Sequence, residues 1–375
     1  MAANTDSTSG PLTNVLILGK TGVGKSALLN YLFGKKVASS GTGSPVTTKG
    51  IHPKEPFKYG SMNIKIWDSW GLEPGDSETW KSIITSAIAE TRAARVRDWF
   101  HTIVYCVDAQ KSRIDDFEIQ SIIKPLLEDG NQIVFVLTKS DVAGEAKIKE
   151  TTKVINKDCP GSPVIPMGSE EIKLRGGKTT KPFGREQLLS HIAINLRHNL
   201  MNQFCRNTQE QAKRFAGHAH KRVMDEVKKE LGTLGTATYG KKFEAYLGDK
   251  ISREYQLATE SLFSLTNRNY QEINQLSSSV FSEFRGEVIA FEKELLPAVA
   301  VSSKVKSLFS RKDLLALLAG GPGFLFLFVK NLLRAKHYAQ ETEKLLKAAD
   351  ERLKNEAETL LKKVREREKS RTWKV

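Results

Sequence analysis

A glycine-rich loop near the N-terminus is the first segment whose residue types and spacing point to chemistry. It reads GKTGVGKS over 19–26, after a short β-branched run and before the amphipathic stretch ALLNYLFG. In that setting backbone N–H groups wrap phosphates, the Lys25 ammonium reaches the β and γ oxygens, and the Ser26 hydroxyl ligates Mg²⁺. The residues that we expect to contact the nucleotide here are Gly19, Thr21, Gly22, Val23, Gly24, Lys25, Ser26 and Ala27.

A second motif, DSWG over 68–71, lies at the end of the apolar run Met62–Trp67. At the tip of a strand the Asp68 carboxylate can hold Mg²⁺ through water, and the backbone N–H of Gly71 can face the γ-phosphate. The motif therefore predicts a switch that senses whether the γ-phosphate is present.

A third motif, TKSD over 138–141, ends the apolar run Ile133–Thr138. A carboxylate at Asp141 can accept hydrogen bonds from both N1–H and the 2-amino group of guanine, which adenine cannot supply. The Lys139 stem can lie over the base. Since the wrong base would leave this polar site unpaired, discrimination can be large. Thr138, Lys139 and Asp141 therefore predict a guanine site.

These three motifs resemble the first, third and fourth boxes of the translation-factor-related GTPases. The stretches GKTGVGKSALLNYLFG, PVTT and DSWGLE are similar to the Era-like and septin-like bacterial GTP-binding proteins, including their dynamin-related branch. The resemblance covers about the first half of the chain. It implies binding of GTP or GDP with Mg²⁺ and hydrolysis of GTP to GDP and phosphate.

The resemblance also implies two further boxes. The Mg²⁺-binding threonine of switch I falls on Thr47 or Thr48, and the sequence does not separate the two. The fifth box falls on MGS over 167–169, where backbone N–H groups of Gly168 and Ser169 would contact the guanine O6. The expected catalytic residues are Lys25, Thr47, Thr48 and Gly71, and the expected metal ligands are Ser26, Thr47, Thr48 and Asp68.

Three positions depart from the pattern of relatives. Leu72 stands where small GTPases carry a water-orienting glutamine, so slow intrinsic hydrolysis is expected. Gly22 stands where potassium-activated relatives have an asparagine, which gives no indication of a monovalent-cation requirement. Arg92, Arg95 and Arg97 are either a solvated helix face or the source of an arginine finger across a dimer.

Short apolar runs separated by helical patterns predict a mostly parallel sheet with helices on both faces. The expected strands are Asn14–Leu18, Met62–Trp67, Thr102–Val107, Ile133–Thr138 and Val164–Pro166. The fold class that we expect is an α/β P-loop G domain followed by an all-α helical domain. The expected boundaries are a disordered tail over 1–12, the G domain over 13–183 and a helical bundle or stalk over 184–375.

The second half lacks strand signals and reads as long helices. We expect them at Arg185–Leu231, Lys241–Leu295 and His337–Lys369. In the last one, apolar residues recur at spacings of three and four, the pattern of a stripe that packs on another helix. This stripe fits a bundle within the chain better than a coiled coil between chains. Its members are Leu346, Ala349, Leu353, Ala357, Leu360 and Val364.

The composition limits the classes of protein. The chain has 375 residues with a formal net charge of +15, of which an excess of 11 lies from Phe183 onward, where 34 basic residues face 23 acidic ones. Three cysteines without paired spacing argue against a disulfide framework or a zinc site and favour a reducing compartment. Because no signal peptide is apparent, we expect a cytoplasmic protein, peripheral on the inner face of a membrane if it reaches one.

An uncharged apolar segment over 314–329 is interrupted by GGPG, and its flanks within 304–336 are basic. It is too short and too broken for an ordinary transmembrane helix. An apolar tip with a cationic collar suits shallow insertion into an anionic membrane surface. The alternatives are a hairpin buried in the bundle and a segment that binds a groove on another protein.

Three functions remain open for the helical half. The first is a dynamin-like GTPase that acts at membranes and forms homo-oligomers through its G domain and helices. The second is a GTPase that binds the ribosome or RNA, for which the positive charge argues. The third is a regulatory GTP sensor that docks on a protein partner.

Overall fold

The computed structural model describes residues 12–38, 50–73, 75–111, 114–173, 179–233, 241–285 and 332–370. The described residues up to Phe204 and those from Asn269 to Arg285 form one compact unit, and the remaining ones form a second. The expected switch I threonines, Thr47 and Thr48, and the apolar segment 314–329 lie outside the described residues.

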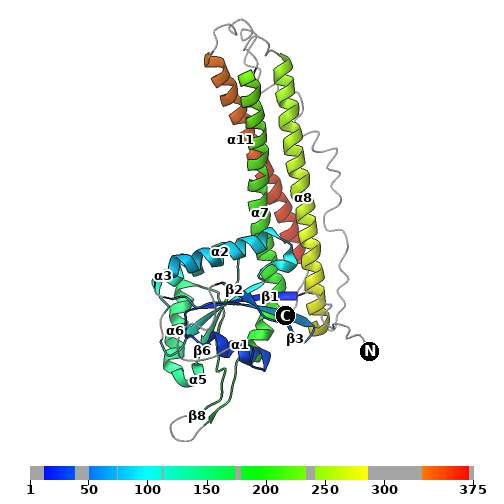
Figure 1. The fold of residues 1–375 in the computed structure, drawn as a ribbon. Coiled ribbons are helices and arrows are strands. Elements are labelled where there is room, and N and C mark those ends of the chain that lie inside the picture. The colour runs from blue at the N-terminus through cyan, green and yellow to red at the C-terminus, as the bar shows by residue number, and fades with distance from the viewer. Residues whose placement is uncertain are drawn as a thin grey trace, which may run out of the picture. The chain divides into compact units, whose positions relative to one another are not determined.

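The first unit is built on a seven-stranded sheet with the order β2-β4-β1-β5-β6-β7, in which β3 also pairs with β4 (Figure 1). The pairs β4-β1, β1-β5, β5-β6 and β6-β7 are parallel, and β2 and β3 run antiparallel to β4. The strands are β1 (Leu12–Gly19), β2 (Ile51–Pro53), β3 (Phe57–Tyr59), β4 (Met62–Ser69), β5 (Thr102–Asp108), β6 (Ile133–Thr138) and β7 (Val164–Pro166). A separate two-stranded ladder joins β8 (Ile172–Lys173) to β9 (Thr179–Thr180).

The predicted α/β class and all five predicted strands are confirmed. Every residue of β5 and β6 is buried, because helices cover both faces of the parallel part of the sheet (Figure 1). The sequence did not predict β2 and β3, since both are three residues long and mix apolar with polar residues. The helical elements of this part are α1 (Lys25–Phe33), α2 (Ser77–Ala93), η1 (Val96–Asp98), α3 (Asp116–Glu118), η2 (Ile119–Ile123), α4 (Lys124–Glu128), α5 (Ser140–Ala143) and α6 (Glu145–Asp158).

Three long helices follow: α7 (Arg185–Thr233), α8 (Lys241–Arg285) and α11 (Leu332–Ser370). They confirm the predicted helical half, although α8 is described only as far as Arg285. The compact unit that contains the sheet extends beyond the expected boundary at 183, because the start of α7 belongs to it. Gln203, for example, donates a hydrogen bond of 2.9 Å to the Phe100 carbonyl. The exact domain limits stay a prediction.

The core of the second unit is formed where the three helices meet. The stripe predicted on α11 is buried there against α7 and α8 of the same chain, as the bundle interpretation expects. Alanines on α7 let the neighbouring helices come close, because they leave little side chain between the backbones. The members of this core are Ala212, Ala216, Ala219, Val223, Val227, Ile251, Tyr255, Ala258, Leu262, Leu346, Ala349, Leu353 and Ala357.

No helix within the described ranges has an apolar stretch long enough to cross a lipid bilayer.

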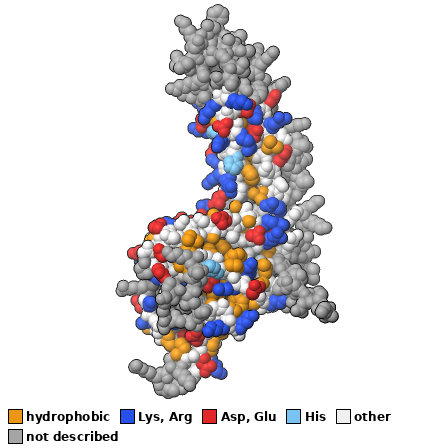
Figure 2. Space-filling view, in the orientation of Figure 1, with side chains coloured by type: hydrophobic (Ala, Val, Ile, Leu, Met, Phe, Trp, Pro, Cys, Tyr) orange, Lys and Arg blue, Asp and Glu red, His pale blue; other side chains and the backbone are white. Residues whose placement is uncertain are grey.

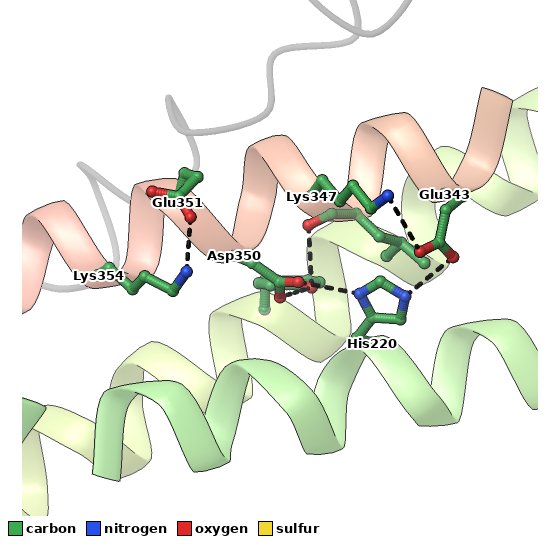
Figure 3. A network of polar contacts seen from close by, with 8 residues as sticks. His220, Glu343, Lys347, Asp350, Glu351 and Lys354 are labelled. Carbon is green, nitrogen blue, oxygen red and sulfur yellow. Dashed lines mark hydrogen bonds and ion pairs between the residues drawn. The ribbon is translucent and has the colours of Figure 1, made fainter. Parts of the chain in front are cut away.

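His220 of α7 is the centre of a polar network in the second unit (Figure 3). Its Nδ1 lies 2.9 Å from Asp350 and its Nε2 lies 3.1 Å from Glu343, both on α11. The Tyr255 hydroxyl of α8 donates to the other carboxylate oxygen of Asp350. Since carboxylates only accept hydrogen bonds, both ring nitrogens donate, which requires a charged imidazolium. Burial alone would lower the pKa of His220, but the bonds to Asp350 and Glu343 outweigh it and raise the pKa.

This network predicts a pH-dependent stability. Because the pKa of His220 is raised in the folded state, its contribution is complete below the unfolded pKa of about 6.5 and is lost as the pH rises through the folded pKa. His220→Asn should lower the free energy of unfolding by about 1 kcal/mol at pH 6 and by less at pH 9, measured by urea unfolding. His218→Asn is the matched control, since His218 is exposed on the same helix. Equal losses at the two pH values would contradict a charged His220.

Candidate nucleotide site

The register of the sheet brings the expected motifs to one edge. Ile17 of β1 pairs with Asp68 of β4, Gly19 of β1 pairs with Cys106 of β5, and Asp108 of β5 pairs with Thr138 of β6. The carboxyl ends of the parallel strands β4, β1, β5 and β6 therefore lie at one edge of the sheet. β1 lies between β4 and β5 in the strand order. This is the position at which open α/β sheets bind ligands.

The loop over 19–26 leaves β1 through a glycine that no other residue could replace without distortion. Gly19 has φ +141°, and a Cβ there would lie 2.6 Å from the Cys106 carbonyl oxygen. The loop ends where α1 begins at Lys25. Ser26 is then the second residue of that helix, with its side chain partly buried beside the loop. The N–H groups of a helix start face the loop, as phosphate binding requires.

Lys25 is buried in this loop and folds back over it. Its Nζ donates hydrogen bonds of 2.9 Å to the carbonyl oxygens of Gly19 and Lys20. Burial lowers the pKa of Lys25, and the nearby Cys106 and Asp68 only partly oppose that shift. Neutral carbonyl oxygens compensate only part of the cost of burying the positive charge of an ammonium group. An anionic phosphate group therefore fits this position.

Asp68 ends β4 beside the loop and has the features of a magnesium ligand. Its Oδ1 is buried and has no hydrogen-bond partner, and its Oδ2 lies 3.8 Å from Lys54 Nζ. Burial raises the pKa of Asp68, while Lys25 and Lys54 act in the opposite direction. A carboxylate oxygen left without a donor fits a cation. Mg²⁺ is held by one or two protein oxygens together with substrate phosphates, so Asp68 and Ser26 fit its protein ligands.

Gly71 lies directly against the loop. A Cβ at this position would be 2.2 Å from Thr21 Oγ1 and 2.5 Å from Thr21 Cα, so only glycine fits. The Thr21 N–H donates to the Leu72 carbonyl at 3.1 Å, and the Leu72 N–H donates to the Gly19 carbonyl at 3.2 Å. The phosphate loop and the start of switch II are therefore joined by two backbone hydrogen bonds.

The TKSD motif is tied to the same loop from the other side. The Thr138 hydroxyl donates to the Val23 carbonyl, and Lys139 Nζ lies 3.0 Å from the Gly22 carbonyl and 2.7 Å from Asp108 Oδ2. Lys139 adopts the left-handed region at φ 55° as the chain turns from β6 into α5. The carboxylate of Asp141 has a buried Oδ2 without a hydrogen-bond partner. A buried acceptor oxygen that lacks a hydrogen-bond donor fits the N–H donors on the edge of guanine.

The expected fifth box is placed next to Asp141. The Ser140 N–H donates to the Met167 carbonyl at 3.1 Å. A Cβ at Gly168 would lie 3.1 Å from the Asp141 Cβ. The Ser169 hydroxyl oxygen is buried and has no hydrogen-bond partner. The structure thus brings together every expected site residue that it describes; Thr47 and Thr48 lie outside the described residues.

Three residues of the site were not found from the sequence. Asp108 is the last residue of the buried strand β5, at the same edge of the sheet as Asp68, and that position was a signal that could have identified it. Lys54 follows the short strand β2, which the apolar pattern did not reveal. Glu73 lies next to Leu72, and its carboxylate Oε1 is 3.3 Å from the Thr21 hydroxyl.

The arginine hypotheses need correction at one position. Arg92 is buried, and its Nη2 donates to Asn131 Oδ1 at 3.0 Å, so it is neither a solvated residue nor a finger. Arg95 is exposed and pairs with Glu272 at 2.6 Å, which agrees with a solvated residue. Arg97 is exposed, as the solvated interpretation expects.

Comparison with known proteins finds a family whose model matches part of the chain. Residues 14–139 match the family described as 50S ribosome-binding GTPase. GTPase Der of Parvibaculum lavamentivorans is 24% identical over 161 residues, which are 41% of this chain and 32% of that protein. GTPase Der of Borrelia garinii is 28% identical over 127 residues, 34% of this chain and 27% of that protein. The chain thus spans less than a third of the length of either relative.

The solved structures to which the chain is similar include Toc33 from Arabidopsis thaliana in complex with GDP and Mg²⁺. It is 18% identical, with 50% of this chain and 84% of that chain covered and a TM-score of 0.37. Era from Aquifex aeolicus is 22% identical, with 55% of this chain and 68% of that chain covered and a TM-score of 0.37.

The family match contains the phosphate loop, Asp68, Gly71 and the first half of the guanine motif. Residues 14–139 of this chain therefore match the 50S ribosome-binding GTPase family and contain the sequence motifs of a P-loop GTPase domain.

Proposed function

We propose that this protein is a molecular switch that binds GTP with Mg²⁺, hydrolyses it to GDP and phosphate, and transmits the difference to its helical half. The observation that supports it best is a pair of buried carboxylate oxygens without partners, Asp68 Oδ1 and Asp141 Oδ2. Asp68 lies near the end of β4, and Asp141 lies in α5, just after β6. A guanine nucleotide with Mg²⁺ would supply a cation to the first and N–H donors to the second.

Each residue then has a defined role. Lys25 exchanges its two carbonyl partners for the β and γ oxygens, and its charge stabilises the negative charge that builds up on them in the transition state. Mg²⁺, when bound through Ser26 and Asp68, neutralises charge on the same oxygens. Gly71 places a backbone N–H at the γ-phosphate, and Asp141 selects guanine. The switch threonine is Thr47 or Thr48.

The target of the switch is a separate question, and RNA or the ribosome is the first candidate. The family description names the 50S ribosome, and the helical half has the larger share of the positive charge. On the visible face of the helical unit, however, Lys and Arg side chains are interspersed with Asp and Glu (Figure 2). A moderate, salt-dependent affinity is therefore expected.

A dynamin-like action at membranes is the second candidate, and it rests on the sequence over 304–336. The apolar segment with basic flanks suits insertion into an anionic surface. In this form of the proposal, GTP would control exposure of the segment. A protein partner of the helical half is the third candidate.

The nucleotide site can be tested through Lys25. Lys25→Ala should weaken GTP and GDP binding at least about 100-fold, because it removes a buried charge-assisted contact to phosphate. Titration with a fluorescent GDP analogue measures this. Lys35→Ala is the control, since Lys35 is exposed just beyond the end of α1. Wild-type affinity in a folded Lys25→Ala protein would overturn the site assignment.

The base preference can be tested through Asp141. Asp141→Asn should weaken GTP binding about 100-fold and improve binding of xanthosine triphosphate, because xanthine has a carbonyl oxygen where guanine has its 2-amino group. Competition binding with GTP, XTP and ATP measures the preference. Asp158→Asn, near the end of α6, is the control. An unchanged ratio of the affinities for GTP and XTP would exclude Asp141 as the residue that selects guanine.

The targets are separated by two pull-down experiments in GTP, GDP and a non-hydrolysable GTP analogue. Pelleting with ribosomal subunits that weakens steeply with salt would support the first candidate. Flotation with anionic liposomes, lost when Phe324, Phe326 and Phe328 are changed to Ser, would support the second. Absence of both would leave the protein partner.

A further inference from the structure

The structure indicates which groups could orient the attacking water in place of the missing glutamine. Leu72, which occupies the glutamine position, is only 4% exposed. Its side chain belongs to the hydrophobic core together with Trp70, Trp80 and Ile84. A buried apolar side chain can neither donate nor accept a hydrogen bond, so it cannot hold a water molecule at the γ-phosphate.

The side chain of the next residue, Glu73, contacts the phosphate loop, whereas that of Leu72 lies in the core. Glu73 is partly buried, and its Oε1 lies 3.3 Å from the Thr21 Oγ1 of the phosphate loop. The Thr21 hydroxyl in turn lies against the Gly71 backbone, where even a methyl group would not fit. A carboxylate and a hydroxyl therefore converge on the residue whose N–H is expected to face the γ-phosphate.

Two backbone hydrogen bonds between the phosphate loop and the start of switch II hold Glu73 close to Thr21. The Thr21 N–H donates to the Leu72 carbonyl, and the Leu72 N–H donates to the Gly19 carbonyl. Because Leu72 is anchored in the core and hydrogen-bonded on both sides of its backbone, Glu73 begins from a defined position. The placement of Glu73 thus depends on the burial of Leu72.

We propose that Glu73 and Thr21 form the water-orienting pair of this enzyme, a role that rests on the GTPase function proposed above. The Glu73 carboxylate accepts a hydrogen bond from the attacking water, and the Thr21 hydroxyl, which donates to Glu73, holds that carboxylate at the edge of the γ-phosphate. The water oxygen forms the new bond to the γ-phosphorus, the bond to the β–γ bridging oxygen breaks, and GDP leaves with that oxygen. Both protons of the water end on the released phosphate and the solvent.

Other charged groups near the site are committed elsewhere. Lys20 Nζ lies 2.7 Å from Glu118, whose other oxygen accepts from the Tyr105 hydroxyl at 2.6 Å. Lys139 pairs with Asp108. Asp68 has the features of the metal ligand.

The test separates a role in the chemical step from a role in holding the loop. Glu73→Gln should lower kcat about 10- to 100-fold, because the amide is a weaker acceptor and can present its N–H₂ instead, with little change in KM or in GDP affinity. Thr21→Val, which keeps the shape but removes the hydroxyl, should lower kcat in the same way, and Thr21→Ser should restore it. Glu78→Gln is the control, since Glu78 is exposed in the first turn of α2.

Single-turnover hydrolysis and titration with a fluorescent GDP analogue are the measurements. A kcat of wild-type size in Glu73→Gln would overturn the proposal, as would a loss of nucleotide affinity with kcat unchanged, which would indicate a structural latch. If the two residues act as one unit, the double variant Glu73→Gln, Thr21→Val should have about the same kcat as the slower of the two single variants. If the wild type binds GTP but does not hydrolyse it, the proposed GTPase function fails first, and that outcome is seen before any variant is measured.

Discussion

The site depends on the alignment of the carboxyl ends of four parallel strands. The register that pairs Ile17 with Asp68 and Asp108 with Thr138 places one polar residue from each of β4, β5 and β6 around the loop that follows β1. A shift by one residue would turn these side chains to the other face of the sheet. The fully buried sequences of β5 and β6 prevent such a shift, because neither face could accept a polar residue from the strand interior.

The motifs of the candidate site couple side-chain chemistry to strand ends, and the structure places these motifs at one edge of the sheet. Gly19, Lys25, Asp68 and Asp141 could each be predicted because a strand pattern and a motif agreed at the same place. The contacts that tie the motifs together could not be predicted. The bond from Lys139 to the Gly22 carbonyl and the bond from Thr21 to Glu73 join residues 117 and 52 positions apart, and no local pattern encodes such pairs. The strands β2 and β3 were missed for a related reason: pairing with β4, rather than their own sequence, makes them strands.

Several charged groups of the site have few compensating partners among the protein's own atoms. Lys25 is buried with only carbonyl partners, and Asp68 and Asp141 each bury a carboxylate oxygen without a donor. The burial of each such group costs free energy of folding, which a correctly placed ligand would offset. Ligand binding and the stability of the G domain are thus linked, since a ligand that binds only the folded protein raises its stability by RT ln(1 + [L]/Kd). The groups that would bind the nucleotide are therefore also the groups whose burial costs free energy of folding.

In the proposed mechanism, the burial of Leu72 in the core moves the water-orienting role from position 72 to Glu73. Trp70, Leu72 and Trp80 fill one region of the core, and the indole N–H of Trp80 bonds the Trp70 carbonyl at 3.0 Å. With leucine anchored in this region, the position that faces solvent and the phosphate loop is the next one, at Glu73. A glutamine at position 72 would have to leave the core to reach the γ-phosphate, and it would leave a cavity beside two tryptophans. The apolar residue thus fixes the start of switch II, and this anchored backbone gives the neighbouring carboxylate a defined place beside Thr21.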